Sequence, residues 1–123
     1  MASARVVLIV DDEPLIRDVL ASEFEDAGYA TVEAESGAEA LGVLERHETI
    51  DLLFTDIRMP GGMDGWQLAE RARELRPELP VIYATGYSEE APRLVPGGRL
   101  FKKPFRTSTL LAALVELGLS AQR

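Results

Sequence analysis

Short apolar runs alternate along the chain with stretches in which apolar residues recur at helical spacing. The first run, at residues 6–10, is uninterrupted, as expected for a strand that is buried on both faces of a parallel sheet. Five such runs are each followed by a stretch of helical period, which indicates a βα repeat. The pattern therefore predicts an α/β domain built around a parallel sheet.

The same pattern predicts where each element begins and ends. Strands are expected at residues 5–10, 29–34, 51–56, 80–85 and 100–102. Helices are expected from Pro14 to Gly28, after a capping box at Ser36 and Glu39, after a cap at Asp64, and over residues 107–117.

The segment from Gly86 to Gly98 is expected to hold only a weak fourth helix. Pro92 and Pro96 fall within it, and a pair of glycines ends it. Because proline lacks a backbone donor and clashes with the preceding turn, at most about two helical turns fit here. This helix is predicted to be the least stable element.

Composition and charge exclude several classes of function. With 123 residues and no cysteine, the chain is expected to form one domain over residues 1–123, without an output domain, a disulfide or a Cys-bound zinc. Its apolar runs are far shorter than the roughly 20 residues of a membrane span, so a cytoplasmic location is expected. The net charge of −8 repels nucleic acid and anionic membranes, and neither is expected as a partner.

Polar side chains lie at or just past the ends of four expected strands. They are Asp11, Asp12, Asp56, Thr85 and Lys103. The ends of parallel strands meet at the edge of the sheet where ligands bind. Three carboxylates packed together need a counter-cation, and oxygen ligands at an open site favour Mg²⁺ over Ca²⁺. The sequence therefore predicts phosphoryl chemistry at a Mg²⁺ site.

The segments around these residues form an ordered set of motifs. VDDEP at residues 10–14, DIRMP at 56–60, ATG at 84–86 and KPF at 103–105 follow one another along the chain. Together they resemble the receiver domain of two-component response regulators, over essentially the whole chain. The resemblance implies a doubly wound (βα)₅ fold with sheet order 2-1-3-4-5. It also implies phosphorylation of one aspartate by a sensor histidine kinase or a histidine phosphotransfer protein.

The resemblance assigns the acidic residues to two roles. Asp56 is expected to be the phosphoacceptor, a carboxylate nucleophile that forms an acyl phosphate. Asp11 and Asp12 are expected to hold Mg²⁺ together with Asp56 and the main-chain carbonyl of Arg58. Taken alone, an acidic pair just before a helix would more often cap that helix, and the two roles are compatible.

The hydroxyl and the ammonium are expected to contact the phosphoryl group. The resemblance implies that Thr85 donates to one phosphoryl oxygen and that Lys103 pairs with another. It also implies a cis peptide before Pro104 that aims the lysine. Lys102 is the competing candidate. Alternation along the strand places the two lysines on opposite faces, and the resemblance favours Lys103 because the residue directly before the proline matches the motif.

Three features depart from the common receiver pattern. Leu100 replaces the usual aromatic switch residue, the interval from Thr85 to Lys103 is short, and Gly61 and Gly62 lengthen the loop after the phosphoacceptor. With the sequence YATGY at residues 83–87, they resemble a subgroup whose fourth strand reads Phe-Ala-Thr-Gly-Tyr and which often stands alone. A monomer or weak dimer is therefore expected, with little change in the burial of Leu100.

The sequence allows three hypotheses about function. The first is a single-domain response regulator, not a turnover enzyme, that signals by contact with a downstream protein or acts as a phosphate shuttle or sink. The second is a Mg²⁺-dependent phosphohydrolase, which would need a second aspartate two residues after its nucleophile, whereas Asp11 and Asp12 are adjacent. The third is a receiver excised from a hybrid kinase.

Overall fold

The computed structural model describes residues 3–46, 49–86 and 92–123, which form one parallel sheet covered on both faces. The sheet order β2-β1-β3-β4-β5 confirms the predicted order. The strands are β1 (Val6–Val10), β2 (Ala30–Ala34), β3 (Leu52–Asp56), β4 (Val81–Thr85) and β5 (Arg99–Lys102).

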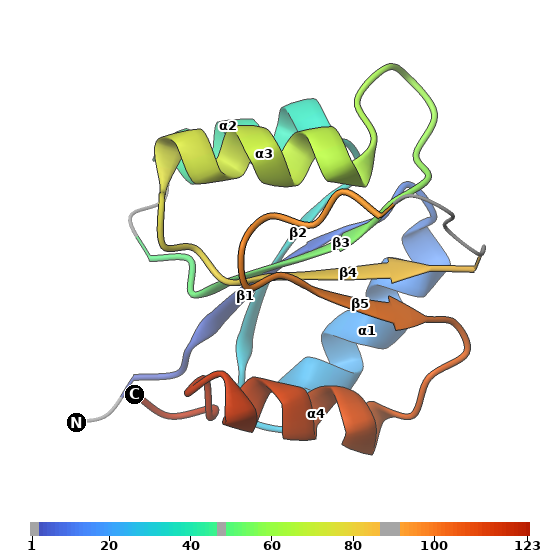
Figure 1. Cartoon of the computed structure of the whole chain (residues 1–123). Coiled ribbons are helices and arrows are strands. Elements are labelled where there is room, and N and C mark those ends of the chain that lie inside the picture. The colour runs from blue at the N-terminus through green and yellow to red at the C-terminus, as the bar shows by residue number, and fades with distance from the viewer. Residues whose placement is uncertain (1–2, 47–48, 87–91) are drawn as a thin grey trace.

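Two pairs of helices cover the two faces of the sheet (Figure 1). They are α1 (Pro14–Asp26), α2 (Gly37–Arg46), α3 (Gly65–Leu75) and α4 (Thr107–Glu116). Helices α2 and α3 cover one face and α1 and α4 the other, which gives two separate apolar cores. Within the described residues, no helix has the length and apolar character needed to cross a membrane.

Helix starts follow the local signals in the sequence. Pro14 occupies the first turn of α1. Asp64 Oδ1 accepts from Gln67 N at 2.8 Å, and Gln67 Oε1 accepts from Asp64 N at 3.0 Å, so α3 begins with a complete capping box. At α2, Ser36 Oγ accepts from Glu39 N at 3.1 Å, which is one of the two hydrogen bonds of the predicted capping box. Each cap satisfies backbone donors that the helix itself cannot pair.

The connection between β4 and β5 differs from the prediction of a weak helix. Residues 92–98 are not helical, and residues 87–91, where the rest of the expected helix falls, lie outside the described part of the chain. Pro92 and Pro96 supply no backbone donors, and Gly97 has φ of 77°, a conformation that favours glycine. These residues prevent a helix over the second half of the segment.

This second half is fastened to the sheet and to α3. The hydroxyl of Tyr83, which is fully buried on β4, accepts from Val95 N at 2.9 Å. The ring of Tyr83 packs against Trp66 of α3, with centroids 4.8 Å apart. Arg73, also on α3, donates from Nη2 to the carbonyl of Pro96 at 2.9 Å. Side chains from the core thus replace the hydrogen bonds that a helix would have made.

We predict that Tyr83→Phe lowers the free energy of unfolding by about 1–3 kcal/mol, because the buried Val95 N–H loses its acceptor. Urea unfolding measures the difference. Tyr29→Phe is the matched comparison, since its hydroxyl donates to Leu119 O at 2.6 Å in a partly buried place that water can reach. We expect a smaller loss there, and equal losses in the two variants would contradict the role of burial.

Candidate functional site

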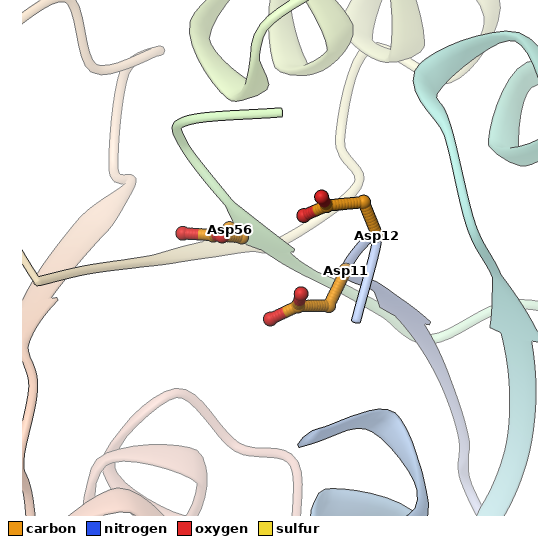
Figure 2. A group of neighbouring side chains, drawn as sticks. All are labelled: Asp11, Asp12 and Asp56. Carbon is orange, nitrogen blue, oxygen red and sulfur yellow. The ribbon is translucent and has the colours of Figure 1, made fainter. Parts of the chain in front are cut away.

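Three carboxylates converge at the carboxyl ends of β1 and β3. Asp11 and Asp12 directly follow β1, and Asp56 is the last residue of β3. Because β1 and β3 are neighbours, with Val10 beside Thr55, these ends lie side by side. One oxygen from each carboxylate lies within 4.8 Å of the other two, and Figure 2 shows the three side chains projecting to the same side.

This donor set fits a hard divalent cation. All three side chains offer carboxylate oxygens, and Asp12 and Asp56 are only half-buried, so that water can complete a coordination shell. Mg²⁺ commonly binds in this way, through one or a few carboxylates and several waters. Arg58, whose main-chain carbonyl was the fourth expected ligand, is an exposed residue two positions past Asp56.

Asp11 is the most buried of the three carboxylates. Its residue is only 2% exposed, and its Oδ1 accepts from Glu13 N at 2.9 Å. Its backbone N–H donates to the carbonyl of Ala34 on β2 at 3.2 Å. The side chain therefore has a fixed direction before any ligand arrives.

Lys103 supplies a positive charge directly to the cluster. Its Nζ lies 3.5 Å from Asp11 Oδ2 and 3.7 Å from Asp56 Oδ1. The Lys103–Pro104 peptide is cis. Lys102 is exposed and is the strand residue that pairs with Thr85. Of the two lysines, the structure thus brings Lys103 to the carboxylates.

Thr85 and Leu100 occupy different places relative to the cluster. Thr85 is fully buried at the end of β4, next to the end of β3, and its carbonyl accepts from Lys103 N at 2.8 Å. Leu100 lies beside Tyr83 in the sheet and packs, half-buried, against the core under α2 and α3. Thr85 therefore lies at the same edge of the sheet as Asp56, and Leu100 packs into the core.

Burial raises the pKa of Asp56 from 3.8 to about 6. Loss of solvation is the main cause, Lys103 opposes it, and the negative charge of Asp11 adds to the rise. The backbone N–H of Ile57 donates to Asp56 Oδ1 at 2.9 Å and also favours the charged form. At neutral pH the group is still mainly a carboxylate, but it is more basic than an ordinary one.

Gly65 is a residue of this site that the sequence pattern did not single out. A Cβ at this position would lie 2.3 Å from the carbonyl oxygen of Asp56 and 2.8 Å from Ile57 Cα. Only glycine lets α3 begin so close to the end of β3, where Gly65 N donates to Ile57 O at 2.8 Å. A glycine directly after the capping Asp64, where a better helix former is usual, was the available signal.

An apolar groove of about 420 Å³ lies between α1 and the loop after β5. Leu15 and Val19, two of its lining residues on α1, are 79% and 58% exposed. Lys103, Pro104 and Phe105 line it from the loop after β5. Lys103 thus belongs both to this groove and to the carboxylate cluster.

The raised pKa of Asp56 predicts a pH dependence of stability in metal-free buffer. The folded protein keeps the proton of Asp56 to higher pH than the unfolded chain, so the contribution of Asp56 to the free energy of unfolding falls as pH rises from 3.8 to about 6 and then levels off. Asp56→Asn cannot ionise. We therefore expect the free energy of unfolding of Asp56→Asn to rise relative to that of the parent by about 2–3 kcal/mol across this window, measured by urea unfolding with a chelator. A difference between the two proteins that stays constant with pH would contradict the raised pKa.

Sequence comparison finds relatives of very different length. Residues 7–115 match the response regulator receiver domain family. Response regulator receiver protein CpdR from Brucella abortus is 33% identical over 122 residues, which are 94% of this chain and 98% of that protein. Sensor histidine kinase RcsC from Escherichia coli is 39% identical over 95 residues. Those residues are 76% of this chain, and the chain spans only 10% of that kinase.

Structural comparison agrees with the family match. The response regulator protein TrrA from Thermotoga maritima, solved in complex with Mg²⁺ and BeF, superposes with a TM-score of 0.82. The two chains are 32% identical, and the match covers 92% of this chain and 98% of that one. By its sequence match and its five-stranded fold, this chain belongs to the response regulator receiver domain family of two-component systems.

Proposed function

We propose that the chain accepts a phosphoryl group on the carboxylate of Asp56 in the presence of Mg²⁺, as a step in two-component signalling. The main support is the cluster of Asp11, Asp12 and Asp56 with Lys103 beside it. The complex of TrrA with Mg²⁺ and BeF adds support, because that relative shares the fold.

In the proposed reaction, Asp56 is the nucleophile. A carboxylate oxygen of Asp56 forms a bond to phosphorus while the bond from phosphorus to the donor's histidine nitrogen breaks, and the electron pair stays on that nitrogen. When bound, Mg²⁺ offsets the repulsion between the carboxylate and the phosphoryl oxygens. Asp11 and Asp12 would hold the cation with Asp56 and the carbonyl of Arg58.

Lys103 and Thr85 would then bind the transferred group. The ammonium of Lys103 already lies between Asp11 and Asp56, so a phosphoryl group on Asp56 comes within its reach. Thr85 ends the neighbouring strand, where its hydroxyl can donate to another phosphoryl oxygen. Both contacts act on the product, and neither is needed to make the new bond.

The groove beside Lys103 is the proposed docking surface for the phosphodonor. A donor histidine must come within bonding distance of Asp56, so the donor's surface must cover the adjoining groove. The exposed Leu15 and Val19 suit an apolar helix face of a histidine kinase or a histidine phosphotransfer protein. Receiver domains have histidine kinases as partners, which fits this occupant.

The output is proposed to be contact with a downstream protein, or onward transfer or storage of phosphate. The match to nearly all of CpdR supports a receiver that works as a separate protein, whereas the match to a small part of RcsC supports a receiver within a larger kinase. Slow, essentially single-turnover behaviour toward phosphate esters is proposed as well. Steady hydrolysis of p-nitrophenyl phosphate would favour a phosphohydrolase instead.

Incubation with acetyl phosphate and Mg²⁺ is expected to add one phosphate to the parent protein, measured by intact mass. Asp56→Asn should abolish the gain, because the amide is no longer a nucleophile. Asp26→Asn, at the exposed end of α1, is the control and should be labelled like the parent. Full labelling of Asp56→Asn would show that the phosphoacceptor is another residue.

The two lysines are expected to differ. Lys103→Ala should still be labelled, but phosphorylation should shift the NMR signals around Thr85 much less, because no ammonium binds the phosphoryl group. Lys102→Ala should behave like the parent, since this lysine is exposed and lies outside the cluster. The reverse order of effects would show that Lys102 is the phosphoryl ligand.

A further inference from the structure

Arg17 links three elements next to the carboxylate cluster. It lies on α1, and its Nη1 donates to the main-chain carbonyl of Asp11 at 2.6 Å. Its Nε lies 3.4 Å from Oε1 of Glu33 on β2. The side chain of Arg17 is only 14% exposed, so its guanidinium is surrounded mainly by protein groups, including these two oxygens. One guanidinium thus connects α1, the end of β1 and β2.

The contact with Asp11 is at the corner where the chain leaves the sheet. The N–H of Asp11 is held by the carbonyl of Ala34, and its C=O is held by Arg17. The two peptides on either side of Asp11 are therefore each held by a group from another element, the first by β2 and the second by α1. The second peptide joins Asp11 to Asp12, and its orientation affects where both carboxylates point, because one side chain leaves the backbone at each end of it.

The two cations near the site act on different atoms. Lys103 faces the carboxylate oxygens of Asp11 and Asp56, so it occupies the space that a metal ion would share. Arg17 is directed at a main-chain carbonyl and a carboxylate outside the cluster, Glu33. The guanidinium carries separate nitrogens for the two oxygens: Nη1 makes the hydrogen bond to Asp11, and Nε lies at ion-pair distance from Glu33 without a hydrogen bond. A lysine ammonium has a single nitrogen and cannot reproduce this geometry.

We propose that Arg17 is a positioning residue for the divalent-cation site, acting through the main-chain carbonyl of Asp11 and itself oriented by Glu33. The proposal rests on the proposed function, since the cation site is the one in which Asp56 would be phosphorylated. Positioning groups behind metal ligands commonly change metal affinity by about 10- to 100-fold when they are removed.

The sign of the effect separates positioning from simple charge. A guanidinium near a cation site repels the cation, so removing its charge alone would tighten Mg²⁺ binding. Removing a group that orients Asp11 and Asp12 would weaken it. A group that only stabilises the fold would change the unfolding temperature and leave the affinity of the folded protein unchanged.

The experiment compares Mg²⁺ affinity in Arg17→Gln, Arg17→Lys and the parent, by NMR titration of the folded proteins. We expect affinity to fall about tenfold in Arg17→Gln and to fall clearly in Arg17→Lys, which keeps the charge but has a single nitrogen. Arg93→Gln is the matched control. It breaks an ion pair with Glu70, 2.9 Å long and exposed, and should bind Mg²⁺ like the parent.

Unchanged or tighter binding in Arg17→Gln would overturn the proposal, as would parental affinity in Arg17→Lys. If circular dichroism shows that Arg17→Gln is unfolded, Arg17→Lys decides the question by the same titration. Labelling of the parent with acetyl phosphate tests the proposed function separately. If the parent is labelled and both Arg17 variants bind Mg²⁺ like the parent, only the proposed role of Arg17 is wrong. If the parent is not labelled, the phosphoacceptor role of Asp56 is wrong.

Discussion

Mutual repulsion among Asp11, Asp12 and Asp56 is the constraint on which the arrangement of the site depends. Three carboxylates within 4.8 Å of one another would separate if their backbones were free to move. They stay together because β1 and β3 are hydrogen-bonded neighbours whose side chains are almost wholly buried. Packing of the two apolar cores thus holds the strands in place and keeps like charges together at one edge of the sheet.

The surroundings of the cluster reflect both its burial and this repulsion. Burial is the main reason why the pKa of Asp56 is raised, the charge of Asp11 adds to the rise, and Lys103 supplies a compensating positive charge. Gly65 removes the steric barrier that would push the end of β3 away from α3. Burying like charges in this way lowers stability, which the rest of the domain must offset, and it leaves Asp56 more basic than an ordinary carboxylate.

The β4–β5 connection shows how the fold adapts where common receiver features are missing. Leu100 stands on β5 where an aromatic residue is usual, and residues 92–98 form no helix. The aromatic ring beside this position is instead that of Tyr83, which pairs with Leu100 from the neighbouring strand β4. Its hydroxyl holds Val95, and its ring meets Trp66. Core packing here fixes a segment that local hydrogen bonding does not.

Features that depend on neighbours along the chain could be predicted from the sequence alone. The hydrophobic period predicted the strands, the cap at Asp64 predicted the start of α3, and the position directly before Pro104 distinguished Lys103 from Lys102. The contacts of Arg17 with Glu33 and of Tyr83 with Val95, and the close approach at Gly65, could be identified only in the folded protein. These contacts join residues that are distant in sequence or separated by a turn, and their existence depends on how helices and strands pack. No local pattern of hydrophobic and polar residues encodes that packing.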